Sequence, residues 1–481
     1  MRSSPNSSTE PLRPILAGAA LFLLILVQLC FRLQFGPGGL LQNADSAKFV
    51  SLCLDGGAAH SPCYPLYILL ARLFFRLKLV FDPGARLSLF SAFLMSGAFL
   101  FLWDFLRRRF GSLLYSFLAV LTVSFLPYAV IAGTEATPVA LSLFLFFLAL
   151  DLLSRPGLPL FIRLLPCGLL MFHDPLALWY GAMLFPVALA VFIREKRAGE
   201  FLLASLCALF CGLMPYLYLC RMVRQGIVLE YPDPFTFAGL GKAVLNGQFW
   251  SNYFCLAWSG AGDNFLAFFA DFFSFSALPL FLIPVLLLGL FFAKPGRGAF
   301  LLPLCALISL VATLLFCVQS YHFYPAQWYW LLSAFIMLFT AMALLALALS
   351  EKLRPVLLPL VFLALVIFSL RSFSPEFKRR SSLEAVRLAH TYGALPYDSI
   401  LLSEDLYGEL QFYRYHLLAY PELVKEKIGI SESTYPGKRN FFFSPRVKNF
   451  LDENGVPYHL FTEVDGIPLY ELGEKYEREE E

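Results

Sequence analysis

The chain has 481 residues, of which 59% are hydrophobic and 15% are charged, and its mean hydropathy is +0.68. Soluble domains are close to half apolar and about a quarter charged, so this chain has more apolar surface than globular cores can bury. A purely soluble protein is excluded. The formal net charge is +3. Because membrane proteins carry an excess of Lys and Arg at their cytoplasmic boundaries, this small positive charge gives no reason to infer a nucleic-acid partner.

The charged residues divide the chain into two parts. Residues 376–481 carry 13 basic and 19 acidic residues, against 24 and 15 in residues 1–375. The long first part is sparsely charged and basic, whereas the short second part is densely charged and acidic. This contrast predicts a helical membrane body over residues 1–375 and a soluble domain over residues 376–481.

The membrane spans follow from apolar runs of about 20 residues and from the positions of Lys and Arg. The first run, 14–33, follows Arg2 and Arg13 and has no small-residue cleavage site after it, which predicts an uncleaved anchor with a cytoplasmic N-terminus. Ten more spans are predicted at 87–106, 112–131, 137–154, 160–173, 176–193, 200–219, 274–293, 299–318, 328–349 and 355–371. Each even-numbered span ends at basic residues, so about eleven spans leave the soluble domain outside.

The segment 34–86 is then the first external loop. Its apolar stretch Tyr64–Phe81 is interrupted by three cations, Arg72, Arg76 and Lys78. This spacing is typical of a helix that lies in the membrane interface. If the stretch crossed the bilayer, the triplet 107–109, which is all Arg, would face outward against the positive-inside rule. We therefore predict an external amphipathic helix.

The soluble part alternates between helical and strand patterns. It predicts a helix from about Leu383, the strand Ser399–Ser403, a helix, a strand near Leu417–Tyr420, a helix, the strand Phe441–Ser444, the helix Pro445–Glu453 and the strand Tyr458–Val464. Such alternation indicates a small α/β domain.

Polar residues at a membrane boundary are costly and are therefore functional candidates. The predicted topology places a set of them at the outer face: Asp45, Lys48, Asp55, His60, Glu135, His173, Asp174, Glu230, Asp233, Lys242, Asp263 and His322. They predict one polar site assembled from several loops.

Structural roles compete with this interpretation. Asp45 is open to a solvated or capping role, Asp55 before two glycines to a turn role, and Glu135 to stabilising the start of a helix. His60 and His322 stand beside Pro or Tyr and have an interfacial alternative. The ten cysteines have no metal-ligand spacing, and pairing of Cys53 with Cys63 stays open.

The first external loop carries a specific order of residues. Asn43-Ala44-Asp45-Ser46 precedes His60-Ser61-Pro62-Cys63-Tyr64-Pro65-Leu66-Tyr67, and after the amphipathic stretch Arg86-Leu87-Ser88-Leu89-Phe90-Ser91-Ala92 opens a span. This order resembles bacterial protein O-mannosyltransferase-like membrane proteins of the GT-C glycosyltransferase superfamily, whose pattern is an Asp followed by His-Pro-Pro-Gly-Tyr-Pro-Leu. Weaker similarities at 135–138, 172–173 and 233–249 extend over roughly the first 330 residues.

The resemblance implies a multi-span helical fold with an outward-facing active site. In that family a first-loop Asp is the general base on an acceptor hydroxyl, and a polyprenyl-phosphate sugar supplies the glycosyl group with inversion. The base role falls on Asp45. The cations that would offset charge on the phosphate are, in decreasing order, Lys48, His60, Arg72 and Arg221 or Arg224. The remaining predicted binding residues are Tyr64, Glu135, His173, Asp233 and His322.

This chain also departs from the family pattern. Lys48 stands where an acidic residue is frequent, and Ser61 and Cys63 replace Pro and Gly around Pro62. The lost acid weakens the case for a divalent metal, and no cofactor is firmly implied. The expected partners are a lipid-linked sugar donor, membrane lipid and an acceptor that is a protein, lipid or glycan, in a bacterial inner membrane.

Two other classes of function compete with the enzyme. A lipid or solute transporter, including a flippase, would show inverted repeats and charges near the midplane, but the hydropathy has no clear repeat and the charges cluster at one face. A catalytically inactive structural subunit of an envelope glycan assembly would use the soluble tail to bind its partner.

Overall fold

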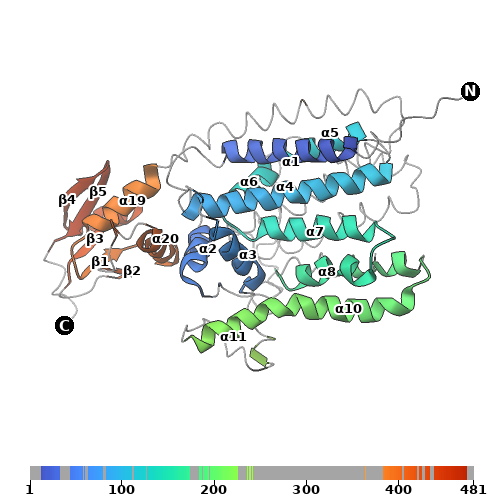
Figure 1. Ribbon diagram of the computed structural model, residues 1–481. Coiled ribbons are helices and arrows are strands. Elements are labelled where there is room, and N and C mark those ends of the chain that lie inside the picture. Colours follow the sequence, from blue (N-terminus) through green and yellow to red (C-terminus); the bar gives the residue numbers. More distant parts are fainter. Residues whose placement is uncertain are drawn as a thin grey trace, which may run out of the picture.

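The protein consists of a helical bundle with a small α/β unit at one end (Figure 1). The computed structural model describes residues 12–32, 44–225 and 383–473, except for 174–183 and shorter gaps in the last two ranges, and a few isolated residues from 236 to 363. The predicted spans between 274 and 371 therefore lie outside the described residues, as do His60, Asp233 and His322. The boundary predicted at 375/376 also lies outside them.

The described bundle is built around α4, a helix of 28 residues. Its elements are α1 (Leu12–Arg32), α2 (Ala44–Asp55), α3 (Pro65–Phe75), α4 (Pro83–Phe110), α5 (Leu113–Ser124), α6 (Pro127–Thr134), α7 (Val139–Leu153), α8 (Leu160–Met171), α10 (Ala198–Leu213), the 3₁₀ helix η1 (Met214–Tyr216) and α11 (Leu217–Arg224). The helices α1, α4, α7, α8 and α10 lie side by side in one layer-like array (Figure 1).

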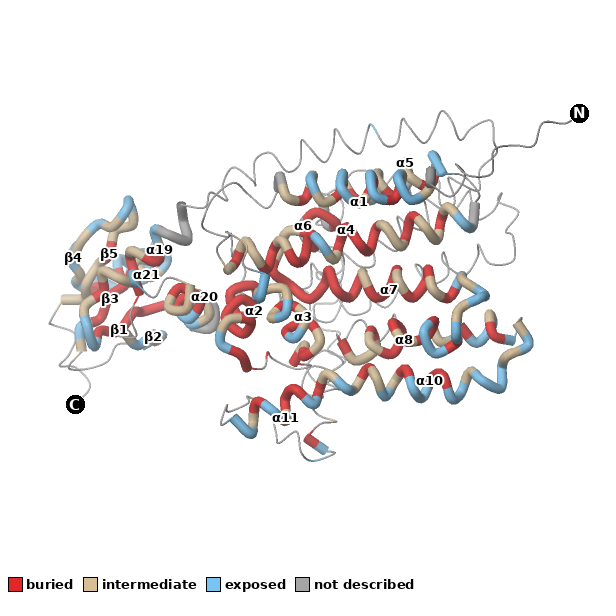
Figure 2. Tube along the Cα trace, viewed as in Figure 1, coloured by how far each residue is buried: buried red, intermediate tan, exposed pale blue. Residues whose placement is uncertain are grey.

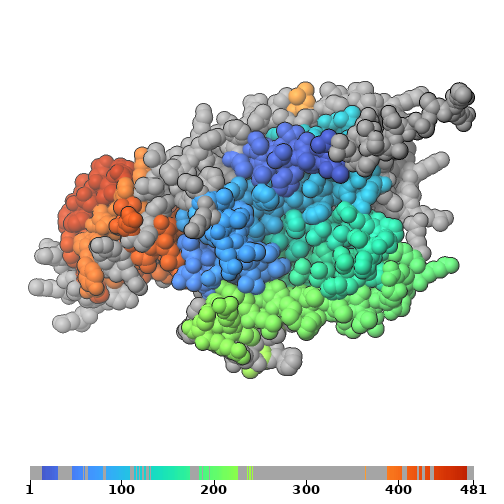
Figure 3. All heavy atoms as spheres, viewed as in Figure 1, coloured from blue at the N-terminus to red at the C-terminus, as the bar shows by residue number. Residues whose placement is uncertain are grey.

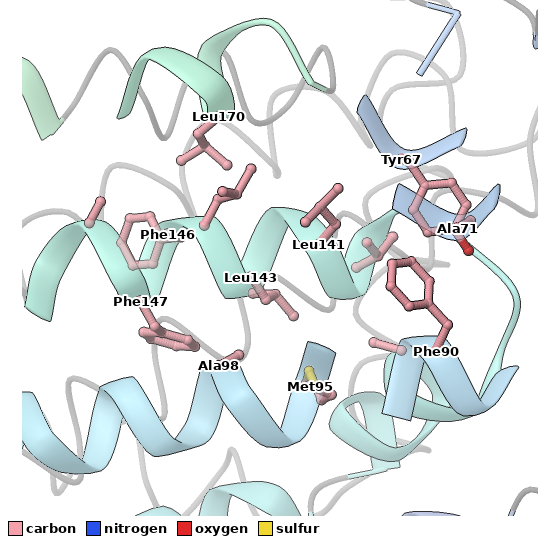
Figure 4. Close-up of a cluster of buried hydrophobic side chains, with 14 of the residues drawn as sticks. Tyr67, Ala71, Phe90, Met95, Ala98, Leu141, Leu143, Phe146, Phe147 and Leu170 are labelled. Carbon is pink, nitrogen blue, oxygen red and sulfur yellow. The ribbon is translucent and has the colours of Figure 1, made fainter. Parts of the chain in front are cut away.

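Apolar side chains fill the space between these helices. Phe90, Met95 and Ala98 of α4 face the side chains of α7, with Leu170 of α8 on the other side of α7 (Figure 4). The outer side of α10 is also apolar but exposed, for example at Leu203, which is 69% exposed (Figure 2). An apolar exposed face on a helix with an apolar buried face is the pattern of a lipid-facing helix.

Some described helices have the dimensions of membrane spans. Pro83–Arg108 and Ala198–Arg224 are long and apolar enough to cross a bilayer by length and composition, and shorter apolar helices include Pro14–Cys30, Val139–Leu153 and Leu160–Met171. The span predicted near 112–131 is divided between two helices, because α5 ends at Ser124 and α6 begins at Pro127. Proline lacks the amide hydrogen that a continuous helix requires there.

Ion pairs join the C-terminal ends of α4 and α7. Arg155 Nη2 lies 2.9 Å from Asp104 Oδ2 and 2.6 Å from Asp151 Oδ2, and Arg108 also pairs with the fully buried Asp151. The other half of α4 contacts α3 through Phe90, roughly 25 Å along the helix from the network. The basic ends of the predicted second and fourth spans therefore gather at one end, as the charge alternation predicted.

Two glycines allow α8 and α10 to cross closely. A Cβ atom at Gly168 would overlap the carbonyl group of Ala208, and one at Gly212 would overlap the carbonyl of Gly168. Nearby, the Tyr216 hydroxyl donates to the Phe172 carbonyl at 3.0 Å and ties η1 to the end of α8. These contacts fix the two helices at backbone-to-backbone distance.

The α/β unit contains a mixed five-stranded sheet. Its elements are α19 (Leu383–Ala394), β1 (Ser399–Leu402), α20 (Leu406–Ala419), β2 (Ile428–Ser431), β3 (Asn440–Phe442), α21 (Pro445–Glu453), β4 (Tyr458–Val464) and β5 (Ile467–Leu472). The strand order is β2-β1-β3-β5-β4, in which β2, β1 and β3 are parallel and β5 is antiparallel to both of its neighbours.

The predicted strands β1, β3 and β4 and the helix α21 are confirmed to within one or two residues at each end. The strand predicted near Leu417–Tyr420 is wrong, because Leu417 to Ala419 form the last turn of α20. A short apolar run does not distinguish a strand from a buried helix end. The helix predicted after it is also wrong, since β2 lies there, and β5 was not predicted.

The helix α20 connects the two parts of the protein. Tyr413 packs in the core beneath the sheet, whereas Tyr415 is fully buried in the bundle core. Arg414 Nη2 lies 3.4 Å from Asp55 Oδ2 at the end of α2. Figure 3 shows the orange tail beside the blue first-loop helices at the end of the bundle opposite the ion-pair network. The tail is thus docked on the helix that begins the first loop.

We expect Gly168→Ala to destabilise the bundle, because the new methyl group forces α8 and α10 apart. The free energy of unfolding should fall by about 1–3 kcal/mol, measured as a lower thermal midpoint of the purified protein in detergent. Gly199→Ala is the matched control on α10, since nothing lies within 4 Å of a Cβ there. Equal midpoints for the two variants would contradict the close crossing.

Candidate functional site

The candidate site begins with α2, which carries the predicted base at its start. Asp45 is the second residue of α2 (Ala44–Asp55), and its side chain lies outside the described residues. Lys48 and Phe49 follow at three and four residues, so they share a helix face with Asp45. Both are buried, with 4% and 2% of their surface exposed. The sequence therefore places a carboxylate and an ammonium group along one face of α2.

The turn before α3 has an unusual backbone conformation. Cys63 and Tyr64 have φ angles of +68° and +46°, a left-handed conformation that costs a non-glycine residue roughly 1–2 kcal/mol. Cys63 occupies the position where the family pattern has Gly. The turn therefore keeps a glycine-like backbone although the glycine is absent. Cys53 and Cys63, whose pairing the sequence left open, are both buried free thiols.

This turn places the Tyr64 ring between α2 and the end of α8. The ring makes edge-to-face contacts with Phe49 at 5.4 Å and with His173 at 6.1 Å between centroids. His173 is fully buried, and its Nε2 donates to the Pro138 carbonyl at 3.2 Å. Because Pro138 closes the turn that follows Glu135, the structure brings Lys48, Tyr64, His173 and the Glu135 turn to the same end of the bundle.

The predicted interfacial helix forms but is shorter than expected. The stretch Tyr64–Phe81 contains α3 over Pro65–Phe75, and the amides of Arg76 and Leu77 bond to carbonyls three residues back, which tightens and ends the helix. Eleven residues span about 16 Å, too short for a bilayer core of about 30 Å. One side is buried at Tyr67, Ile68 and Ala71.

Arg72 on α3 reaches the turn that follows α2. Its Nη1 donates to the Tyr218 hydroxyl at 3.3 Å, and the same oxygen accepts the Gly57 amide at 3.4 Å. Burial raises the pKa of the nearby Cys53 thiol to about 12, and the positive charge of Arg72 only partly opposes this shift. The thiol is therefore neutral near pH 7 and supplies no counter-charge to the guanidinium.

Arg72 differs from most other arginines of the described part, because it is half-buried and pairs with no carboxylate among the residues described. By contrast, carboxylate partners are found for Arg107, Arg108, Arg155, Arg163, Arg197, Arg414 and Arg439. A partly desolvated cation without an anionic partner favours binding of an anionic ligand. This property makes Arg72 of α3 a candidate for binding an anion.

The structure assigns different places to the other candidates. Asp55 pairs with Arg414, and Arg221 and Arg224 lie in the last turn of α11. Tyr218 and the Gly56-Gly57 turn were not singled out from the sequence. The sequence patterns that could have pointed to them are weak. Tyr218 precedes Arg221 by three residues on a strongly amphipathic helix, and two adjacent glycines follow Asp55. Within the described ranges, no cluster of three or more His, Cys, Asp or Glu residues is suited to a metal ion.

The described part of the chain combines a bundle of apolar helices with an α/β unit docked at one end, beside the polar residues described above. No protein-family model and no curated protein matches this chain. Among solved structures, it is similar to ArnT from Cupriavidus metallidurans bound to undecaprenyl phosphate, with a TM-score of 0.57 and 12% identity over 94% of this chain and 97% of that chain. The apo form of ArnT matches with a TM-score of 0.43, 14% identity and the same coverage.

ArnT is a GT-C glycosyltransferase, so the likeness confirms the GT-C fold class that the sequence predicted. The similarity extends over almost the whole of both chains. At 12% identity it is a likeness of fold, and the roles of individual residues rest on the chain's own chemistry.

We expect Tyr415→Ala to loosen the tail from α2. Removing a fully buried aromatic ring costs about 3–5 kcal/mol when the site does not collapse, so the variant should show a lower thermal midpoint and faster proteolytic release of residues after 383. Phe450→Ala, which removes a ring that is 62% exposed, is the control and should change neither. Unchanged proteolysis of the Tyr415 variant would argue against this contact.

Proposed function

We propose that the protein is a membrane glycosyltransferase that moves a sugar from a polyprenyl-phosphate donor to an acceptor hydroxyl on the extracytoplasmic side, with inversion at the anomeric carbon. The first-loop sequence pattern and the GT-C fold support this proposal. The observation that carries it is Arg72, a half-buried guanidinium with no carboxylate partner among the described residues, located beside the turn that ends α2.

In this reaction Asp45 is the general base. Its carboxylate takes the proton of the acceptor hydroxyl as the hydroxyl oxygen attacks the anomeric carbon. The bond from that carbon to the phosphate oxygen breaks, and the phosphate leaves with the electron pair. Lys48, one helical turn after Asp45 on α2, is the cation closest in sequence to the base.

Arg72 stabilises the negative charge that grows on the leaving phosphate. Tyr64 and His173 form an aromatic and imidazole wall at the same end of the bundle. The set of substrate-binding residues is completed by His60, Glu135, Asp233 and His322. Arg221 and Arg224 remain further candidates for phosphate contact on α11.

The helix α3 gives the lipid donor a route from the bilayer. Its exposed side includes Leu69 and Leu73, which are 39% and 58% exposed, and Arg72 lies between them in the sequence. An interfacial helix with an apolar side next to a cation lets an isoprenoid chain stay in lipid while its phosphate reaches the guanidinium.

The charge pattern supports an inner-membrane protein with a cytoplasmic N-terminus and an extracytoplasmic tail beginning near residue 376. The O-mannosyltransferase-like pattern favours a protein hydroxyl as the acceptor, and a lipid or glycan hydroxyl would require the same base chemistry.

Asp45→Asn tests the base. The amide keeps the size of the side chain but does not accept the proton, so consumption of lipid-linked sugar should fall by about 10²–10⁴, measured in purified membranes with a radiolabelled donor. Asp55→Asn is the matched control, because Asp55 is a carboxylate on the same helix that pairs with Arg414, and it should keep its turnover. Full turnover by Asp45→Asn would refute the assignment of the base.

Arg72→Gln tests the phosphate contact. Loss of one hydrogen bond to a charged group costs about 1.5–3 kcal/mol, so KM for the lipid donor should rise about 10- to 100-fold. The control is Arg76→Gln at the exposed end of the same helix. An equal rise in KM in both variants would indicate that positive charge attracts the anionic lipid to this surface in general, and that Arg72 is not a specific phosphate-binding residue.

A further inference from the structure

The hydroxyl of Tyr218 lies between two N–H donors. It accepts from the Gly57 amide at 3.4 Å and from Arg72 Nη1 at 3.3 Å, and its side chain belongs to a residue that is only 8% exposed. A tyrosine hydroxyl accepts hydrogen bonds and also has one proton to donate. The two N–H groups engage the oxygen as an acceptor, and no residue in the described part of the chain accepts its proton.

The Gly56-Gly57 turn allows this arrangement. Gly56 and Gly57 have φ angles of +95° and +121°, which favour glycine. A Cβ atom at Gly56 would lie 2.6 Å from Arg72 Nη1, so a side chain there would displace the guanidinium. The close approach ties Arg72 of α3 to the end of α2, the helix whose second residue is Asp45.

Two hydrogen-bond donors, the Arg72 guanidinium and the Tyr218 hydroxyl, lie together here, and no carboxylate among the described residues pairs with either of them. The guanidinium of Arg72 keeps N–H groups that no described carboxylate engages, and the Tyr218 hydroxyl is polarised by the two donors that it accepts. Groups of this kind form short, strong hydrogen bonds with phosphate oxygens. Arg72 lies between the exposed Leu69 and Leu73 in the sequence of α3, the side of the helix where a lipid chain would lie.

We propose that Tyr218 is a second phosphate-binding residue: it holds Arg72 Nη1 against the Gly56-Gly57 turn and donates its own hydroxyl proton to a phosphate oxygen of the lipid donor. This inference rests on the proposed function, because it takes the anion to be the phosphate of a polyprenyl carrier. It adds Tyr218 of α11 to the phosphate contact that Arg72 supplies from the first loop.

The test compares Tyr218→Phe with Tyr216→Phe in the full-length protein in detergent. Each variant loses one hydroxyl and keeps its ring, but the Tyr216 hydroxyl donates to the Phe172 carbonyl at the end of α8. The affinity for undecaprenyl phosphate, measured by calorimetry, should fall about tenfold in Tyr218→Phe. It should stay within twofold of wild type in Tyr216→Phe, and the thermal midpoints without ligand should be similar.

A double-mutant cycle shows whether Tyr218 and Arg72 bind the phosphate together or affect binding independently. Tyr218→Phe added to Arg72→Gln should weaken binding by less than twofold further, because Tyr218 acts partly through Arg72. Fully additive losses would overturn the coupling. Wild-type affinity in Tyr218→Phe, or equal losses in both tyrosine variants, would overturn the inference.

Inorganic phosphate is the second probe, because it has the same head-group chemistry without the lipid. The wild-type protein should bind it at least 100-fold more weakly than undecaprenyl phosphate, since the isoprenoid chain adds apolar contacts. Equal affinities would assign the seat to free phosphate and overturn the lipid part of the inference. If the wild type turns over the donor while Tyr218→Phe keeps wild-type binding, the proposed function stands and this inference falls.

Discussion

A charged group in an apolar bundle is stable only with a partner of opposite charge, and this constraint organises the described structure. At one end of the bundle, the carboxylates of Asp104 and Asp151 pair with three arginines and join α4 to α7. Arg163 is fully buried and bidentate to Glu195. Arg72 at the opposite end has only the Tyr218 hydroxyl among the residues described. The same rule that explains the paired arginines makes Arg72 a position for an anionic ligand.

The α/β tail takes part in this end of the bundle. The helix α20 places one face under the sheet and the other, with Tyr415, into the bundle core against α2. Because α2 begins with Asp45 and ends at the glycine turn beneath Arg72, the tail packs on the element that joins the candidate base to the candidate phosphate seat. Movement of the tail would therefore be transmitted to both through a single short helix.

Part of the architecture could be predicted from the sequence, because apolar periodicity and charge alternation are local properties. The helix within Tyr64–Phe81 and the bounds of α21 and β4 followed from them. The end of α20 could not be predicted, because its apolar last turn is half-buried and packs through Leu417 on the core of the α/β unit and through Ala419 on the bundle core. Tyr218 was also missed, since its partners Gly57 and Arg72 are about 150 residues away in sequence.

The residue at position 63 shows how far a changed motif can keep its geometry. The sequence pattern that this loop resembles has Gly at this position, a residue suited to positive φ, and here Cys63 adopts a φ of +68°. The strain of roughly 1–2 kcal/mol is offset because Cys63 is 99% buried and the following Tyr64 packs on Phe49 and His173. The tertiary contacts of Tyr64 thus impose the turn that glycine would permit. Cys at position 63 therefore leaves α3 and Arg72 in place. The backbone conformation identifies this motif better than its residue identities do.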